Sequence, residues 1–279
     1  MIIDAHHHFW KYDPVTYGWI NDEMKEIRKD FLPADLKETV EKAGVAKVIS
    51  VQARQCLEET DWLLKFASEN DYISGVTGWV PLADDHIGDV LDHYKGETKL
   101  KAVRHVVQDE PDPGFILGEK FNRGVALLKD YALVYEILVF EDQLPDAIRF
   151  VDRHPGQRFV LDHIAKPRIK EGLTEPWKQN ITELARRDHV SCKISGMVTE
   201  ASLTEWTEKD LFPYFLHVLE AFGPARMMFG SDWPVCLSAV SYSDWLDLVK
   251  KWISPLSSDE QKNILYKNAV NVYNLHESN

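Results

Sequence analysis

The chain has 279 residues, 44% of them hydrophobic, which is enough for one large core, and α/β barrels of this length usually form a single domain. Its 45 Asp and Glu residues outnumber its 32 Lys and Arg residues, so the net charge is −13. This balance argues against a nucleic-acid or anionic-membrane partner, because both call for a basic patch, and we expect a small-molecule partner instead.

Short β-branched runs alternate with longer segments of helical periodicity along the whole chain. This alternation is typical of parallel strands that are joined by crossover helices. The predicted strands are, in chain order, Ile2–His6, Lys47–Gln52, Ile73–Val80, Lys101–Val106, Leu133–Val139, Arg158–His163, Val190–Ser195 and Arg226–Gly230.

The segments between and after these strands predict helices at Pro33–Ala43, Glu58–Asn70, Asp84–Tyr94, Phe115–Asp130, Gln143–His154, Glu175–Asp188, Glu205–Phe222 and Tyr242–Ile253. Eight strand–helix units predict an α/β fold, a single-domain (β/α)8 TIM barrel over residues 1–279. The segment from Ser258 to Leu275 predicts an additional C-terminal helix, which docks on the barrel through an apolar side that includes Ile264 and Leu275. The long connection from Phe9 to Leu32 is predicted to form a lid or a substrate wall.

Cysteine usage predicts a reducing compartment. Cys56, Cys192 and Cys236 are odd in number and lack C-x-x-C spacing, which argues against a disulfide framework and against a thiolate zinc site. The sequence opens directly on a predicted strand, and no apolar run reaches about 18 residues. We therefore expect a cytoplasmic protein without a membrane span, whereas a homo-oligomeric state stays open.

The two ends of the predicted barrel carry matching polar residues. Alternation along the first strand places Asp4, His6 and His8 on one face and Ile3, Ala5 and His7 on the other. Asp232 shares the parity of Met228 and Gly230 at the carboxyl end of the last strand. Active sites of such barrels lie at the carboxyl ends of the strands, so a closed barrel predicts that His6, His8 and Asp232 converge.

Other strand ends add His163 with Lys166 beyond it, Arg54, and the adjacent pair Arg104 and His105. From a regular strand the two members of that pair cannot both point inward, and the sequence leaves open which one faces the site. We predict that Asp232, His163 and His105 are catalytic. The predicted substrate-binding residues are Trp10, Arg54, Arg104, Lys166 and Trp233.

The predicted cluster suits hydrolysis by either of two routes. His6, His8, His163 and Asp232 form a nitrogen and oxygen ligand set that fits one divalent ion, with zinc as the first choice and an open position for water. Without a metal, Asp232 would act as general base on water while His and Arg side chains stabilise the developing oxyanion. The residues leave both routes open.

Two further residue types invite a prediction. Alternation places Lys193 inside the barrel, where a buried ammonium needs a carboxylate partner, and Asp4 is the candidate. A Schiff-base role for Lys193 is the alternative, but it would leave the three histidines unexplained. The tryptophans near strand ends suit a wall on which the apolar face of a sugar ring can lie; they are Trp10, Trp19, Trp79 and Trp233.

The motifs at these residues resemble the amidohydrolase superfamily, in particular its sugar-acid lactonases and the dicarboxypyrone lactonase. They are D-A-H-H-H-F-W at Asp4–Trp10, V-R-H at Val103–His105, L-D-H-I-A-K-P at Leu161–Pro167, K-I-S-G at Lys193–Gly196 and G-S-D-W-P at Gly230–Pro234. The resemblance implies that His6 and His8 form the first-strand pair, that His163 is a later-strand histidine and that Asp232 activates water. The predicted strand Leu133–Val139 departs from the metal-binding members because it carries no histidine.

The resemblance implies hydrolysis of a small sugar-acid lactone, such as L-fuconolactone or L-rhamnonolactone, to the aldonic acid. A metal-dependent decarboxylase of the same superfamily is the alternative enzyme. A catalytically silent barrel that binds a sugar acid as a sensor or scaffold is the alternative from another class. The particular lactone and its ring size are not readable from the residues.

Overall fold

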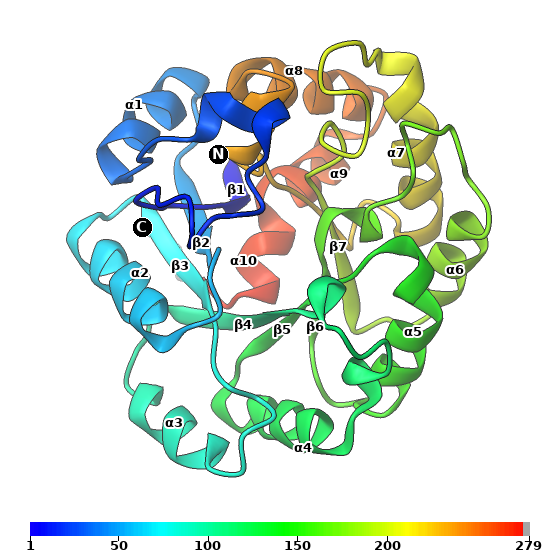
Figure 1. Cartoon of the computed structure of the whole chain (residues 1–279). Helices are drawn as coiled ribbons and strands as arrows, with labels where there is room; N and C mark the ends of the chain where they lie inside the picture. Colours follow the sequence, from blue (N-terminus) through cyan, green and yellow to red (C-terminus); the bar gives the residue numbers. More distant parts are fainter. Residues whose placement is uncertain (276–279) are drawn as a thin grey trace.

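The computed structural model describes residues 1–275 and shows eight parallel strands in a nearly closed barrel, surrounded by helices (Figure 1). The strands pair in sequence order, as successive strand–helix–strand crossovers require. They are β1 (Ile3–His7), β2 (Lys47–Val51), β3 (Ile73–Gly78), β4 (Leu100–Val106), β5 (Val134–Leu138), β6 (Phe159–Leu161), β7 (Val190–Ile194) and β8 (Met227–Phe229). The predicted barrel is therefore confirmed.

One helix follows each strand and covers the outside of the barrel (Figure 1). The helices are α1 (Pro33–Ala43), α2 (Leu57–Glu69), α3 (Ile87–Tyr94), α4 (Glu119–Leu127), α5 (Leu144–Asp152), α6 (Trp177–Leu184), α7 (Glu208–Phe222) and α8 (Tyr242–Ile253). The predicted helix from Phe115 is broken near Gly118, and α7 begins three residues later than predicted, where Thr207 and Asp210 form a capping box. Within residues 1–275, no helix has the length and apolar character to cross a membrane.

The barrel closes between the first and the last strand. Just beyond β8, the backbone N–H of Asp232 donates to the carbonyl of His6 at 2.8 Å, and the N–H of His8 donates to the carbonyl of Trp233 at 2.6 Å. These bonds join residues that lie more than 220 positions apart in the sequence. Closure therefore fixes the height of Asp232 relative to the two histidines.

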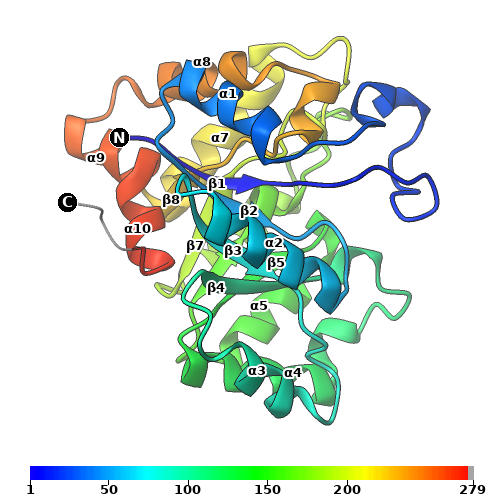
Figure 2. The ribbon, with the colours of Figure 1, turned by 90° about the vertical axis from the view of Figure 1, so that its left-hand side faces the viewer.

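The predicted C-terminal helix is present as α9 (Ser258–Lys262) and α10 (Asn268–Val272), joined by a π-helical turn. Figure 2 shows both at the end of the barrel opposite to the segment that follows β1. There, Ala269, Tyr273 and Leu275 pack on an inner apolar layer of Ile3, Ala5, Ile49, Ala102, Val134, Val160 and Met228. This floor seals the amino end of the barrel, so a ligand enters from the carboxyl end.

The predicted alternation along β1 is wrong before His6. The register against β2 shifts between Asp4 and His7, where three steps on β1 match two on β2. This bulge turns Ala5 and His6 both inward, while Asp4 points out and accepts a hydrogen bond from Tyr242 of α8 at 3.0 Å. Beyond the bulge alternation resumes, and His7 faces the helices as predicted, 3.0 Å from the hydroxyl of Ser50.

Candidate active site

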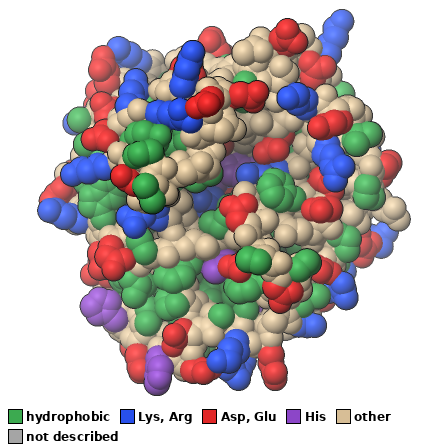
Figure 3. Space-filling view, in the orientation of Figure 1, with side chains coloured by type: hydrophobic (Ala, Val, Ile, Leu, Met, Phe, Trp, Pro, Cys, Tyr) green, Lys and Arg blue, Asp and Glu red, His purple; other side chains and the backbone are tan. Residues whose placement is uncertain are grey.

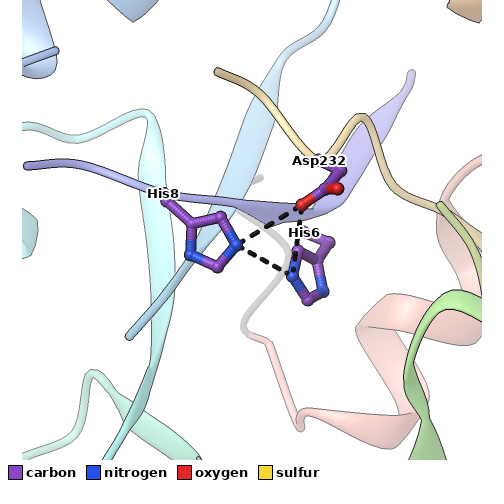
Figure 4. A group of neighbouring side chains, drawn as sticks. All are labelled: His6, His8 and Asp232. Atoms are coloured by element: carbon purple, nitrogen blue, oxygen red, sulfur yellow. Dashed lines mark hydrogen bonds and ion pairs between the residues drawn. The ribbon is translucent and has the colours of Figure 1, made fainter. Parts of the chain in front are cut away.

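His6, His8 and Asp232 converge at the carboxyl end of the barrel, as the sequence predicts (Figure 4). The Nε2 atoms of the two histidines lie 3.2 Å apart, and Oδ1 of Asp232 lies 3.4 Å from Nε2 of His8 and 3.8 Å from Nε2 of His6. All three side chains are buried. The cluster therefore presents two ring nitrogens and a carboxylate oxygen toward one point.

His163 joins this cluster through an uncommon backbone. Residues 163–166 have φ values of 51°, 50°, 60° and 46°, a left-handed turn that L-residues adopt at a cost of roughly 1–2 kcal/mol each. The turn lets Asp162 and His163, which are neighbours in sequence, both reach His6: a carboxylate oxygen of Asp162 lies 3.5 Å from its Nδ1, and the ring of His163 lies 4.4 Å away. Such strain is typical of sites where function fixes the geometry.

Gly196 leaves room for the imidazole of His163, because a Cβ at position 196 would lie 2.4 Å from its Nδ1. The φ of Gly196 is +65°, a value that also favours glycine. We expect Gly196→Ala to push the imidazole off Ser195, its partner at 3.0 Å, and to lower kcat on the order of 10²-fold. Gly172→Ala is the matched control, since Gly172 has φ +67° and open space around it. A steady-state assay of both variants checks this, and equal kcat losses would contradict the explanation.

Beneath the histidines lies a buried ionic cluster. The ammonium of Lys193 lies 2.7 Å from Glu136 and 3.2 Å from Asp162, and Arg104 lies 2.9 Å from the other oxygen of Asp162. Two cations thus face two carboxylates, which is the pairing that buried charges need. Thr77 and Tyr273 also donate to Glu136, at 2.8 and 2.5 Å.

The prediction that Asp4 pairs with Lys193 is wrong, because the β1 bulge turns Asp4 out of the barrel. Its carboxylate instead accepts from the backbone and hydroxyl of Ser231, at 2.8 and 2.6 Å. Burial raises the pKa of Asp4 to about 6, against these hydrogen bonds. Asp4 therefore ties β1 to the residue that precedes Asp232. Lys193 is fully buried between two carboxylates, which argues against a Schiff-base role.

The electrostatics of the cluster keep His6 and His163 neutral and Asp232 charged. Burial lowers the pKa of His163 to about 4, and burial together with Lys193 holds the pKa of His6 well below its ordinary value. Burial alone would raise the pKa of Asp232, but the neighbouring His163 and His8 hold it below its ordinary value. At neutral pH the site thus combines a carboxylate base with the neutral imidazoles of His6 and His163.

A cavity of about 600 Å³ opens above these residues. Figure 3 shows a hollow on this face, with histidine and basic side chains inside it. The loop between β1 and α1 contributes Thr16 and Trp19 to the wall, so its predicted role as a substrate wall fits the structure. The polar lining suits a hydroxylated ligand; it includes His8, Arg54, Arg104, Gln108, His163 and Asp232.

Of the adjacent pair on β4, Arg104 faces the site and His105 does not. Arg104 lines the cavity, donates to the carbonyl of Gln52 at 2.5 Å and keeps an Nε without a partner among the described residues. His105 stacks on Phe115 and lies 2.6 Å from Glu110, on the helix side of the strand. The predicted catalytic role of His105 is therefore not supported, because the pleat turns it away from Asp232.

Three predicted substrate-binding residues lie outside this cavity. Trp10 is fully buried and donates to the carbonyl of Lys29 at 2.9 Å, and Trp233 packs against Phe31. Both belong to the core under the first loop, where each ring packs against Phe31. Lys166 lines a neighbouring cavity of about 610 Å³, where Glu200 is 3.8 Å away. Of the four predicted tryptophans, Trp19 lines the main cavity; Trp79 donates to His105 instead.

Sequence reasoning gave no role to Glu59 of α2, which shapes the cavity wall. Its buried carboxylate accepts from the backbone N–H groups of Ala53 and Arg54, at 2.9 and 2.6 Å. It thereby fixes the loop that carries Arg54 into the cavity. The signal for it was weak, because an acidic residue in a first helical turn more often faces solvent near the helix dipole.

Glu59 gives stability a specific pH dependence. Burial raises its pKa from 4.5 to about 7, so the folded chain binds this proton more tightly than the unfolded chain, and stability falls as pH rises through that window. We expect a loss on the order of 3 kcal/mol, which Glu59→Gln should abolish. Urea unfolding at pH 5 and pH 8 measures this. Exposed Glu58→Gln is the control, and an unchanged pH dependence in Glu59→Gln would refute the assignment.

The type and spacing of the donor atoms fit a divalent ion. Donor atoms of His6, His8 and Asp232 all lie within 4.8 Å of one another, and so do those of His6, Asp162 and His163. The Nδ1 of His8 lies 2.8 Å from the carbonyl of Val51, which leaves its Nε2 lone pair directed at the cluster. His6, His8 and Asp232 are thus the residues that would hold the ion, whereas His163, the fourth predicted ligand, belongs to the second group, with His6 and Asp162.

Comparison with known proteins places this site in a family context. The amidohydrolase family matches residues 3–275. An L-fucono-1,5-lactonase of Burkholderia multivorans is 39% identical over 99% of this chain and 96% of that protein. A second L-fucono-1,5-lactonase, from Burkholderia ambifaria, is 33% identical over 87% of this chain and 83% of that protein.

Solved structures agree with these relatives. A crystal structure of an amidohydrolase from Burkholderia multivorans with bound zinc is 38% identical, covers 99% of this chain and 100% of that chain, and superposes with a TM-score of 0.94. The similarity thus extends over the whole barrel, including β1, which carries His6, and the segments just beyond β1 and β8, which carry His8 and Asp232.

Proposed function

The chain belongs to the amidohydrolase family, and from that premise we propose that it hydrolyses the lactone of a sugar acid to the open-chain acid. L-fucono-1,5-lactone is the first candidate substrate, because two relatives with 39% and 33% identity carry that activity in their names. The reducing setting favoured by the free cysteines supports a cytoplasmic enzyme.

The convergence of Asp232 with His6 and His8 carries the proposal. A lactone is a neutral ester, so its hydrolysis needs a base for water, donors for the oxygen that becomes negative, and room for the ring. Asp232 provides an ionised carboxylate on the cavity wall. Arg104 and the neutral imidazole of His163 provide donors, and about 600 Å³ accommodates one sugar ring.

The proposed reaction begins with water between Asp232 and the lactone carbonyl carbon. Asp232 removes a proton from the water as its oxygen bonds to that carbon, and the carbonyl π pair moves to oxygen. The guanidinium of Arg104 and an imidazole N–H stabilise the resulting oxyanion. As the tetrahedral intermediate collapses, the bond to the ring oxygen breaks, and protonated Asp232 returns its proton to that oxygen. The products are a hydroxyl and a carboxylic acid, and Asp232 is regenerated.

A divalent ion held by His6, His8 and Asp232 would supply Lewis-acid polarisation of the carbonyl and a more acidic water. The relative with bound zinc supports this possibility, whereas β5 contributes no histidine to the described site. The roles of Asp232 as base and of Arg104 as donor follow from their positions in the cavity wall.

The alternatives lose support. A metal-dependent decarboxylase shares the fold, but two solved decarboxylases similar to this chain are only 13% and 12% identical, which supports the fold alone. A silent sugar-acid sensor would have no use for an ionised carboxylate that shares a cavity with two histidines.

A pH-indicator screen of aldonolactones tests the proposal. We expect acid release from L-fucono-1,5-lactone or a close stereoisomer, measured before and after chelation and with added Zn²⁺. Both the 1,5- and the 1,4-ring forms belong in the panel, because the residues do not define ring size. Failure of every lactone under all three metal conditions would overturn the proposal.

A further inference from the structure

Lys193 makes a contact that the proposed reaction does not use. Its Nζ lies 3.1 Å from the Nδ1 of His6, inside the barrel and away from the cavity. An ammonium group carries only donors, so this contact makes Nδ1 of His6 the acceptor. A neutral imidazole has one acceptor and one N–H, and the proton of His6 must then lie on Nε2.

The surroundings of His8 agree with this assignment. The Nδ1 of His8 lies 2.8 Å from the carbonyl of Val51, and a carbonyl only accepts, so the proton of His8 lies on Nδ1. Its Nε2 is then an acceptor, 3.2 Å from the Nε2 of His6. A proton on Nε2 of His6 satisfies this contact, whereas the other tautomer would set two lone pairs against each other.

Two contacts oppose the assignment. Oδ1 of Asp162 lies 3.5 Å from Nδ1 of His6 and, as an acceptor, favours a proton on that nitrogen. Nη1 of Arg104 lies 3.3 Å from Nε2 of His6, and a hydrogen bond between them would require Nε2 to be the acceptor. The same Nη1 has a charged acceptor in Asp162 at 2.9 Å, whereas Lys193 makes the shorter contact with His6. Nη1 of Arg104 carries two N–H groups, and its bond to Asp162 takes one of them. Lys193 makes the shortest of the three contacts with His6, at 3.1 Å, so the geometry favours Nδ1 as the acceptor.

We propose that Lys193 is a positioning residue that fixes His6 in the tautomer with its proton on Nε2, directed at His8 and Asp232. Where the chain acts as proposed above, this N–H acts on the reaction through His8 and Asp232, which line the cavity, whereas His6 itself is fully buried. The same tautomer works against metal binding, because a nitrogen that carries a proton offers no lone pair to a metal.

The second consequence follows from how histidine ligands are supported. A metal-bound histidine donates its other N–H to a carboxylate, a carbonyl or water, and changes in that partner alter metal affinity 10–100-fold. His8 has such a partner in Val51. At the corresponding nitrogen, Nδ1, His6 has the ammonium of Lys193 instead, and a carboxylate oxygen of Asp162 lies 3.5 Å away. Removing Lys193 should let His6 donate to Asp162 and free its Nε2.

The test compares three chains. Lys193→Met alone would leave two carboxylates facing one cation, so Lys193→Met is combined with Glu136→Gln, which keeps Arg104 balanced by Asp162. Glu136→Gln alone retains Lys193 and is the control for the tautomer measurement. The wild-type chain is the reference.

Nitrogen-15 NMR of histidine-labelled protein reads the tautomer directly, with His6 assigned by its absence from a His6→Gln spectrum. We expect a protonated Nε2 and a bare Nδ1 in the wild type and in Glu136→Gln. In the double variant the signals should shift toward a protonated Nδ1. A protonated Nδ1 in the wild type would overturn the proposal even if the double variant does not fold.

Calorimetric titration with Zn²⁺ alone reads the second consequence. We expect the double variant to bind at least on the order of 10-fold more tightly than the wild type, whose buried cluster carries the same net charge. Equal or weaker binding would overturn the proposal. Neither measurement uses a lactone, so a failure of the proposed hydrolysis and a failure of this assignment are distinguishable.

Discussion

Asp232→Asn is expected to fold as the wild type does and to lose lactone hydrolysis by roughly 10²–10⁴-fold in kcat, the range of a general base. The amide keeps the size of the side chain but cannot take a proton from water. Its backbone N–H still donates to the carbonyl of His6 at 2.8 Å, so the closure between β8 and β1 is kept. The measurement is single-substrate kinetics with L-fucono-1,5-lactone, together with thermal unfolding.

Two controls separate the base from its neighbours. Ser231→Ala removes the hydroxyl that ties the preceding residue to Asp4 at 2.6 Å and should affect stability more than chemistry. A KM near the wild-type value in Asp232→Asn would show that the cavity still binds the lactone. Full kcat in Asp232→Asn would remove Asp232 from the mechanism.

The sequence predicts the large features of this site because they follow from closure. Eight strand–helix units leave few topologies, and a barrel must set the first strand beside the last. His6, His8 and Asp232 therefore meet without any knowledge of side-chain packing. The neutral or charged state of each group, in contrast, depends on burial that one sequence does not reveal.

The errors of prediction share a cause, which is local departure from regular backbone. The bulge in β1 sends Asp4 outward and Ala5 inward, and the left-handed turn after β6 brings both Asp162 and His163 to the site. Strict alternation allows neither. Trp10 and Trp233 were placed by their position near strand ends, whereas their side chains fill the core beneath the first loop. The register shift in β1 and the positive φ values after β6 depend on contacts between strands that are distant in sequence, so the pattern within one strand does not predict them.

Arg104→Met should cost about 3–5 kcal/mol of folding free energy, the effect of breaking a buried ion pair. The guanidinium lies 2.9 Å from Asp162 and donates to the carbonyl of Gln52 at 2.5 Å, with 3% of the residue exposed. Methionine fills similar volume but leaves Asp162 with Lys193 as its remaining cation, which Asp162 shares with Glu136. Urea unfolding measures the loss.

Adding Asp162→Asn to Arg104→Met decides whether charge or shape is responsible. The double variant removes one cation and one carboxylate, and the pair of Lys193 and Glu136 at 2.7 Å stays balanced. If uncompensated charge causes the loss, the double variant should recover much of the stability lost in Arg104→Met. Its hydrolysis should stay low, because the donor that Arg104 presents to the cavity is still missing. Recovery of activity together with stability would show that Arg104 supports the barrel rather than the substrate.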